Sequence, residues 1–276
     1  MNKTLPTLLL SLASSCAFAT TSLPDTLHTE LKYWWDFEKN GDPVDYSTTP
    51  STDKPATWNA PFGWEAPTAN ETGYGKLGNT TKDPNGVPHD GNSQYPWLGA
   101  GESLNLKIDQ FTISFDIKDL SSTDWRDLFS INTDGGTHEN NKLCLQKGTG
   151  NNLLLYPTNF GGDAIAGEIS CSYTPSAWTT FTITCTGSLL SLYKDGLLMG
   201  NIKCNIGDEA ITGIQFGKNF GGGRPIDSAK IDNVGLWNTA LTADQVKSLN
   251  GLVPEPTTVS LSLVGLAALM LRRRRA

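Results

Sequence analysis

The sequence contains few charged residues and few histidines, and it lacks the short motifs that mark common enzymes. Charged residues make up 18% of its 276 positions, below the ~25% typical of soluble domains, and there are 3 histidines. Neither the H-E-x-x-H motif of zinc proteases nor the G-x-S-x-G nucleophile elbow occurs. Both of these enzyme classes are therefore without support. The hydrophobic share of 38% is sufficient for a core, which excludes a chain that is disordered throughout.

Arginine is nearly absent before the C-terminal end. Only Arg126 and Arg224 precede a terminal cluster, and the net charge of the whole chain is −7. Nucleic acids and anionic lipid surfaces are bound through patches of arginine and lysine. We therefore expect no nucleic-acid partner and no direct electrostatic binding to a membrane.

Residues 1–19 are typical of a secretory signal peptide. Lys3 lies in a short basic start, Leu8 to Ala13 are largely apolar, and Ala17-Phe18-Ala19 supplies a cleavage site of small residues. A buried first helix is the alternative. Export would remove Cys16 together with the peptide.

The C-terminal end, residues 253–276, combines three features in a fixed order. A Pro-Glu-Pro triplet comes first, and the thirteen residues 259–271 that follow are largely apolar. At ~1.5 Å per residue they span about 20 Å, less than the ~30 Å hydrocarbon core, and the terminal arginines would hold the end of the chain on the cytoplasmic side. The charged and triplet residues of this signal are Pro254, Glu255, Pro256, Arg272, Arg273, Arg274 and Arg275.

This arrangement resembles the PEP-CTERM sorting signal of Gram-negative bacteria. The resemblance implies transient anchoring in the inner membrane and cleavage near the triplet by an exosortase. The mature chain would then reach the cell surface or the extracellular matrix. A plain tail anchor is the alternative.

Short segments of alternating apolar and polar residues fill the chain between these two ends. Within 180–186 the even positions are threonine, whereas Phe181, Ile183 and Cys185 share the opposite face. Such alternation predicts strands with one buried and one wet face, and Asp195-Gly196 predicts a tight hairpin. No regular alternation of strands and helices appears, so we predict an all-β antiparallel sandwich over residues 20–252. Further strands are expected at 111–117, 143–146, 153–156, 165–173, 189–193 and 231–237.

One short helix is predicted at the end of this domain. Thr242 and Gln245 form a capping box, Val246 and Leu249 supply an apolar face, and Gly251 is suited to end the helix in the left-handed conformation.

The stretch from about 41 to 100 is rich in Gly, Pro, Asn and Thr and carries scattered aromatic residues. We predict a loop-rich insertion that either binds a ligand or packs as a lid over the sandwich. Sugar rings stack on flat aromatic faces, so these side chains are candidate ligand-binding residues, although they could equally form a small core of the insertion. The candidates are Trp58, Trp64, Tyr95 and Trp97. Of the adjacent pair Trp34 and Trp35, which must face opposite ways in a strand, we expect one in the core and the other exposed.

Four cysteines remain after removal of the signal peptide, and none forms a C-x-x-C pair of the kind found in zinc sites. In an exported protein an even number favours disulfides, with three possible connectivities. The alternation places Cys171, Cys185 and Cys204 on inward faces, whereas Cys144 shares a face with Lys142 and Gln146. We therefore expect a Cys171–Cys185 disulfide.

Three segments, in this order and spacing, resemble the LamG-like branch of the concanavalin A-like jelly rolls. Residues 111–115, after a small strand at 104–106, are similar to an early core strand of that family. Residues 178–197 are similar to its tryptophan-led strand and "YxDG" hairpin, and residues 231–242 to its closing strand and the start of a short helix. The likeness covers about residues 30–250. It implies a jelly roll that binds glycans or proteins, often with calcium.

The segment around residue 138 is rich in side-chain oxygens. Asp134, Glu139 and Asn140 are candidate calcium ligands, because calcium prefers several carboxylate and carbonyl oxygens. A solvated hairpin loop is the alternative.

Enzymes on this sandwich, the laminarinase-type glycoside hydrolases, are marked by an E-x-D-x-x-E strand that this chain lacks. The glycine-rich segment 216–224 also lacks the G-K-[ST] ending of a phosphate loop. The sequence thus favours an exported, surface-sorted, non-catalytic protein that binds extracellular polysaccharide, glycoprotein or matrix. A structural matrix component without a specific ligand and a glycoside hydrolase with an unrecognised carboxylate pair stay open as alternatives.

Overall fold

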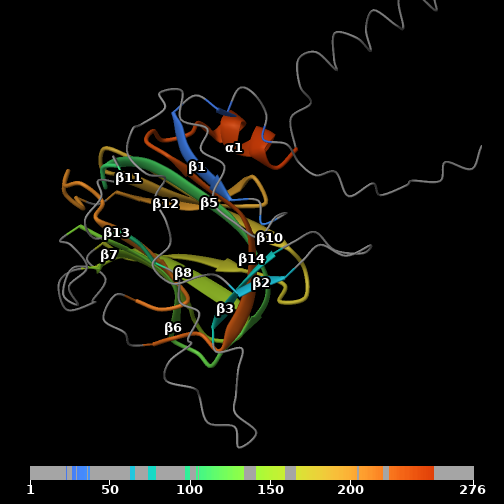
Figure 1. Cartoon of the computed structure of the whole chain (residues 1–276). Helices are drawn as coiled ribbons and strands as arrows, with labels where there is room; N and C mark the ends of the chain where they lie inside the picture. The colour runs from blue at the N-terminus through green and yellow to red at the C-terminus, as the bar shows by residue number, and fades with distance from the viewer. Residues whose placement is uncertain are drawn as a thin grey trace, which may run out of the picture.

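Two antiparallel sheets stacked face to face make up most of the described structure (Figure 1). The computed structural model describes residues 23, 27–28, 30–35, 37, 63–65, 74–78, 97–99, 104, 106–133, 141–158, 166–203, 205–219 and 224–251. The predicted all-β antiparallel sandwich is confirmed. Within the described ranges, no helix is both long enough and apolar enough to cross a bilayer.

The larger sheet has eight strands in the order β12-β11-β10-β5-β14-β3-β2, with β1 also paired to β14. The long central strands β5 and β14 pair with each other, although they lie far apart in the sequence. The strands are β1 (Leu31–Trp35), β2 (Gly63–Glu65), β3 (Tyr74–Gly78), β5 (Gln110–Ser121), β10 (Thr179–Thr186), β11 (Leu189–Lys194), β12 (Leu197–Lys203) and β14 (Ser228–Trp237).

The smaller sheet has six strands in the order β4-β13-β6-β7-β8-β9. Its centre is a meander in which β6, β7, β8 and β9 follow one another in sequence and in space. The strands are β4 (Trp97–Gly99), β6 (Arg126–Asn132), β7 (Asn141–Lys147), β8 (Asn152–Pro157), β9 (Ile169–Ser172) and β13 (Gly213–Phe216).

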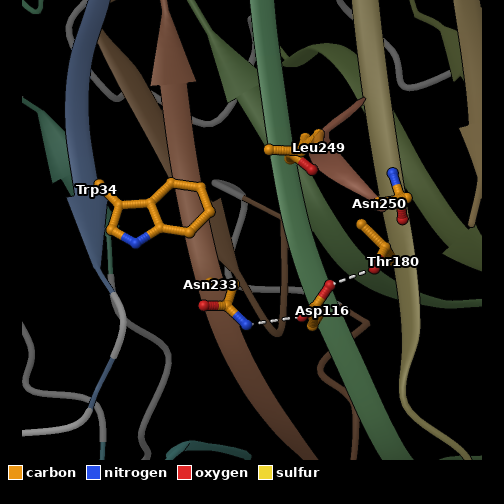
Figure 2. A pocket seen from close by; sticks show the side chains of 7 residues that line it. Trp34, Asp116, Thr180, Asn233, Leu249 and Asn250 are labelled. Atoms are coloured by element: carbon orange, nitrogen blue, oxygen red, sulfur yellow. Dashed lines mark hydrogen bonds between the residues drawn. The ribbon is translucent and has the colours of Figure 1, made fainter. Parts of the chain in front are cut away.

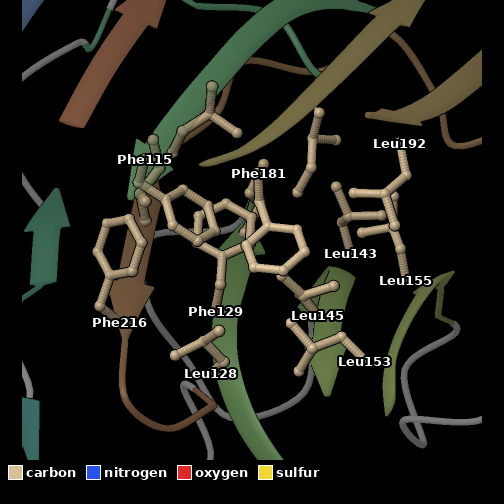
Figure 3. Close-up of a cluster of buried hydrophobic side chains, with 14 of the residues drawn as sticks. Phe115, Leu128, Phe129, Leu143, Leu145, Leu153, Leu155, Phe181, Leu192 and Phe216 are labelled. Atoms are coloured by element: carbon tan, nitrogen blue, oxygen red, sulfur yellow. The ribbon is translucent and has the colours of Figure 1, made fainter. Parts of the chain in front are cut away.

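The main core lies between the sheets and is centred on four phenylalanines (Figure 3). Phe115 and Phe181 come from the larger sheet, and Phe129 and Phe216 from the smaller one. The ring of Phe115 meets that of Phe216 edge-on at 5.1 Å between centroids, and Phe129 lies 5.2 Å from Phe216. All four side chains are fully buried, as alternation on strands with one inward face requires.

The predicted helix is confirmed as α1 (Ala243–Leu249) on the outer side of the larger sheet (Figure 1). The backbone N–H of Gln245 donates to Thr242 Oγ1 at 3.3 Å, and the N–H of Thr242 donates to Gln245 Oε1 at 2.9 Å. Gly251 follows with φ of 65°, the left-handed conformation expected at the helix end. Val246 anchors the helix in a second cluster of buried residues: Leu23, Leu27, Leu31, Trp34, Tyr193, Trp237, Leu241 and Val246.

The hairpin turns are also where the sequence places them. Asp195 and Gly196, both with positive φ, join β11 to β12, and the segment 148–151 joins β7 to β8. Positive φ at both central residues gives a turn whose twist matches that of the flanking strands.

Three sequence-based expectations about the fold are wrong. The stretch 41–100 is not only a loop-rich insertion, because β2 and β3 add to β14 and β4 adds to β13. Leu104 and Leu106 are buried but do not form a strand. Trp34 and Trp35 do face opposite ways, but neither is exposed, because the second cluster covers Trp34 on the outer side of the sheet.

Candidate functional site

The sequence-predicted ligand and calcium residues lie largely outside the described residues. Trp64 lies in β2 and Trp97 in β4, where only the backbone is described. The remaining predicted residues, Trp58, Tyr95, Asp134, Glu139, Asn140, Pro254, Glu255, Pro256 and Arg272–Arg275, fall outside the described ranges. Their assignment stays a prediction from the sequence.

The expected Cys171–Cys185 disulfide is not present in the structure. Cys171 lies on β9, at the end of the smaller sheet, whereas Cys185 lies on β10, between β5 and β11 of the larger sheet. Both side chains do point into the core, as the alternation predicts, but from opposite layers. Burial raises the pKa of the Cys171 thiol to about 11, so this thiol is protonated at neutral pH. Inward facing alone was therefore not a sufficient criterion for pairing.

Residues from four strands and from the end of α1 surround a small pocket on the outer face of the larger sheet (Figure 2). Its volume is about 180 Å³. The wall on one side is the indole of Trp34, and Asp116 faces it across the pocket. The described residues that line it are Trp34, Ser114, Asp116, Thr180, Asn233, Leu249 and Asn250.

The polar floor of this pocket follows from the alternation of β5 and β10. Phe115 points into the core, so Ser114 and Asp116 must lie on the outer face. Thr180 lies directly opposite Asp116 in the β5–β10 pairing, and its hydroxyl donates to Asp116 Oδ1 at 2.5 Å. Neighbouring outward residues are paired in the same way, with the hydroxyls of Ser114 and Thr182 2.9 Å apart.

A bulge in β14 directs Asn233 toward the same carboxylate. The β5–β14 register shifts between Asp232 and Gly235, and Asn233 has φ of 48°. The extra residue lets Asn233 Nδ2 donate to Asp116 Oδ2 at 2.8 Å. Bulges commonly re-aim a side chain in this way, and here the result is a carboxylate with a donor on each oxygen.

The aromatic wall is held in place by the second buried cluster. The rings of Trp34 and Trp237 meet edge-on with centroids 6.2 Å apart, and the indole N–H of Trp237 donates to the carbonyl of Leu27 at 2.8 Å. Both rings pack over Gly235, where an added Cβ would lie 2.8 Å from the Trp34 ring. Because Gly235 has no side chain, the indole of Trp34 can lie flat against the sheet beside the pocket.

The end of α1 closes the pocket from the other side. Thr112 on β5 fixes the segment before the helix, donating to the carbonyl of Thr239 at 2.7 Å and accepting from the N–H of Leu241 at 2.8 Å. This attachment brings Leu249 and Asn250 over the outer face of the sheet. The side chain of Asn250 also donates to the carbonyl of Val246 at 2.9 Å, which fixes its position at the helix end.

The pocket is electronegative. Burial raises the pKa of Asp116, the hydrogen bonds from Thr180 and Asn233 lower it, and the nearby negative charge of Asp195 raises it again. Asp195 is held close by the backbone N–H of Thr180, which donates to its Oδ1 at 3.0 Å. Asp232 lies opposite Asp116 in the β5–β14 pairing. None of the residues that line the pocket is lysine, arginine or histidine.

A second polar cluster lies on the outer face of the smaller sheet, around Asp127. Gln146 Nε2 donates to Asp127 Oδ1 at 2.8 Å, and Asn219 Nδ2 donates to Oδ2 at 3.0 Å. Burial raises the pKa of Asp127 to about 6 against the opposing effects of Gln146, Arg224 and the other neighbours. Asp127 is only 1% exposed, and both of its oxygens have donors. This cluster is a satisfied buried network rather than an open site.

No group of three or more His, Cys, Asp and Glu side chains in the described part of the chain is arranged to hold a metal ion. The predicted calcium ligands are not among these residues. Calcium therefore stays a prediction attached to Asp134, Glu139 and Asn140.

Sequence reasoning did not identify the pocket, although part of its signal is visible. The threonines of 180–186 were recognised as one face of a strand, but that face was assigned to solvent. Asp116 lies in the middle of a strong core strand, where an outward carboxylate signals a polar floor. Its partner Asn233 is 117 residues away, and no local pattern reveals the bulge that brings the two together.

The two stacked antiparallel sheets define the chain as a β-sandwich. The chain belongs to the concanavalin A-like lectin/glucanases superfamily, because the Laminin_G_3 family model matches residues 90–247. The resemblance seen in the sequence is thus confirmed for the fold. The comparison with curated proteins gave no match.

The solved structures that are similar to this chain include receptor-binding domains of bacterial toxins. The binding domain of Paraclostridial Mosquitocidal Protein 1 is 18% identical with a TM-score of 0.57, over 81% of this chain and 52% of that one. The receptor-binding domain of botulinum neurotoxin type G is 16% identical with a TM-score of 0.54, over 81% and 51%. A third similar structure concerns the interaction of botulinum neurotoxin type C with two ganglioside molecules. It is 14% identical with a TM-score of 0.58, over 83% of this chain and 53% of that one. This chain therefore spans about half the length of these chains, and the likeness is one of fold.

Proposed function

We propose that this protein is an exported, surface-sorted, non-catalytic binding protein for extracellular glycan or matrix, and that the pocket on the larger sheet holds one sugar unit. The observation that carries the proposal is the pairing of an indole wall, from Trp34, with a floor of carboxylate, amide and hydroxyl groups. A sugar ring presents apolar C–H faces and polar hydroxyl edges. A few fixed polar groups beside an aromatic side chain suit such a ligand, and Trp34, which is 6% exposed, contributes the small accessible part of its indole.

The size of the pocket fits a single unit of a polymer. Its volume of about 180 Å³ is below the ~300–1,000 Å³ of pockets for drug-sized ligands. A chain of sugars would then be held by one residue in the pocket and by weaker contacts outside it. Repetition of weak contacts along a polymer still gives firm attachment to a matrix.

The arrangement of acids favours binding over hydrolysis. Glycoside hydrolases use two carboxyl groups on either side of the scissile bond. Among the described residues that line the pocket, Asp116 is the only one with a carboxylate, and both of its oxygens accept hydrogen bonds from the protein. Burial also raises the pKa of the Cys144 thiol, so this cysteine is not poised as a nucleophile.

The known proteins of similar fold support a binding role. They include domains described as receptor-binding, and one of them is described as interacting with gangliosides. Fold alone does not carry function, so this support adds to the pocket and does not replace it.

The sequence supports delivery to the cell surface of a Gram-negative bacterium. The signal peptide at 1–19 accounts for export, and the PEP-CTERM-like segment at 253–276 accounts for processing by an exosortase-type partner. The aromatic residues Trp58, Trp64, Tyr95 and Trp97 would extend the binding surface, and calcium would be held by the acidic segment near residue 138.

A glycan array, probed with the purified protein and supplemented with intact matrix polysaccharides, tests the proposal. We expect retention on a defined subset of glycans and no release of reducing ends from them. Retention on none of them, together with incorporation into matrix, would favour the structural component instead. Steady release of reducing ends would favour a glycoside hydrolase.

A further inference from the structure

The charge in the pocket narrows the kind of sugar that it accepts. Asp116 forms the floor of the pocket. Asp195 lies close enough to add negative charge, and Asp232 lies directly opposite Asp116 in the β5–β14 pairing. A negatively charged sugar, such as a uronate or a sulfated unit, would be repelled from this position. The group that complements a half-buried carboxylate beside an indole is a cation.

The lysines next to Asp116 in the β5–β14 register are engaged away from the pocket. Lys118 and Lys230 are the next charged pair in that register. Lys230 Nζ lies 3.3 Å from a carboxylate oxygen of Asp119 and over the ring of Tyr74, and Lys118 Nζ lies over the ring of Trp178. Lys194, opposite the inward-facing Phe181, donates to the carbonyl of Ser172 on the smaller sheet at 2.9 Å. These contacts leave the charge of Asp116 to be compensated by a ligand.

A metal ion does not fit the position. Among the described lining residues, Asp116 is the only charged group that could coordinate a metal ion. The described residues also offer no cluster of three acidic, histidine or cysteine ligands. An ammonium group fits better, since it needs one carboxylate and a few neutral acceptors rather than a coordination shell of oxygens.

We propose that this pocket binds a protonated primary amine carried by a sugar ring, as in an unacetylated hexosamine unit of an extracellular polysaccharide. The ammonium group lies against the Asp116 carboxylate, and the sugar ring lies beside the small exposed part of the Trp34 indole. Thr180 and Asn250 are placed to hydrogen-bond the ring hydroxyls. This inference rests on the glycan-binding function proposed above and specifies the class of sugar.

The polar lining favours an amino sugar over the other common source of a primary amine, a lysine side chain. A lysine presents a purely aliphatic stem below its ammonium group, with no hydroxyl for the amide and hydroxyl groups of the lining. An amino sugar can add hydrogen bonds to these groups and bring its ammonium group to the carboxylate at once.

Isothermal titration calorimetry with an oligomer of β-linked glucosamine and with its fully N-acetylated counterpart tests the inference on the unmodified protein. Acetylation removes the positive charge and keeps the ring. We expect the glucosamine oligomer to bind at least about tenfold more tightly, as loss of a charge-assisted hydrogen bond implies. Equal affinity, or a preference for the acetylated oligomer, would overturn the inference while leaving a glycan-binding function intact. Absence of binding to any glycan on the array would instead remove the proposed function itself.

The substitution Asp116→Asn locates the effect. It keeps the size of the side chain, its new oxygen can still accept from Asn233, and its new amide can donate to the Thr180 hydroxyl. We expect affinity for the glucosamine oligomer to fall at least about tenfold and the preference over the acetylated oligomer to disappear. Asp127→Asn is the matched control, because it also removes a buried carboxylate with two donors but lies on the other sheet, and it should leave affinity unchanged.

Two further results show whether the amine belongs to a sugar or to a lysine, and whether it binds in this pocket. A lysine-containing peptide that binds as tightly as the glucosamine oligomer would overturn the assignment to a sugar. Asp116→Asn protein that unfolds at the wild-type temperature and binds the oligomer with wild-type affinity would overturn the assignment to this pocket.

Discussion

Gly235 is the residue over which the indoles of Trp34 and Trp237 pack, and it has no room for a side chain. An added Cβ would lie 2.8 Å from the Trp34 ring and closer still to the Trp237 ring. We predict that Gly235→Ala displaces Trp34 and lowers the free energy of unfolding by about 1–3 kcal/mol, the usual cost of overpacking. The loss is measured by chemical denaturation, and the displacement by a change in tryptophan fluorescence.

Gly187→Ala is the control for this prediction. Gly187 has φ of 58°, but an added Cβ there meets nothing within 4 Å. This substitution should cost only the strain of the left-handed backbone, about 1 kcal/mol, and leave tryptophan fluorescence unchanged. A fluorescence change of the same size in both variants would show that Gly235 does not position the indole.

Asp127 makes stability depend on pH in the direction opposite to most carboxylates. Burial raises its pKa from 3.8 to about 6, so between these values the folded protein keeps a proton that the unfolded chain has lost. The stabilisation from this proton is present at low pH and is lost as pH rises through about 6. We predict that the wild type loses about 2 kcal/mol relative to Asp127→Asn between pH 4 and pH 7, measured by urea denaturation of both proteins.

The difference between the two proteins isolates Asp127, because all other groups titrate in both. A difference that stays constant from pH 4 to pH 7 would mean that the pKa of Asp127 is not raised. A difference that grows as pH falls would mean that its pKa is lowered.

Helix α1 is short, and the capping box of Thr242 and Gln245 fixes its start. Seven residues are too few for a helix to be stable alone, so its position depends on the cap and on packing of Val246. We predict that Thr242→Ala lowers the free energy of unfolding by about 1 kcal/mol, as loss of a cap usually does, measured by thermal denaturation. Ser248→Ala in the same helix should be neutral or slightly stabilising, since alanine is the better helix former. Equal losses in the two variants would remove the role assigned to the cap.

How far the elements could be predicted depended on whether their signals were local. The capping box of α1 and the Asp195-Gly196 turn are set by neighbouring residues, and both were predicted. Strand β6 was not, because its bulge lets both Leu128 and Phe129 enter the core and interrupts the simple alternation. The short strands at 63–65 and 74–78 are not evident from the sequence, because β3 pairs with β14 about 150 residues later and β2 pairs in turn with β3.

The candidate site was even less accessible to sequence reasoning. Each lining residue is ordinary within its own segment, and the pocket exists only where β1, β5, β10, β14 and the end of α1 meet. The sequence directed attention to aromatic residues in 41–100, whereas the aromatic wall of the described pocket comes from Trp34. The register of β1 on β14 places that residue beside Gly235, and nothing in either segment alone indicates it.

In the proposed function of the whole molecule, the segments on either side of the sandwich direct its delivery. The apolar run at 259–271 is short for a permanent anchor, and the Pro-Glu-Pro triplet before it resembles a processing site. We predict that a host with the matching exosortase releases a mature chain that ends between Leu252 and Pro256, as intact-mass analysis of surface protein would show. Replacing Arg272–Arg275 by neutral residues should impair retention of the tail in the membrane and its processing. Recovery of the complete tail, Ala276 included, would identify an ordinary anchor.

In the proposed function, the outer face of the larger sheet binds a sugar unit between Trp34 and Asp116. A crystal structure of the protein with a bound glucosamine oligomer is the decisive test. We predict density for one sugar ring beside the Trp34 indole, with its amine within about 3 Å of an Asp116 carboxylate oxygen. An oligomer bound only elsewhere, for example on the outer face of the smaller sheet near Asp127, would contradict it.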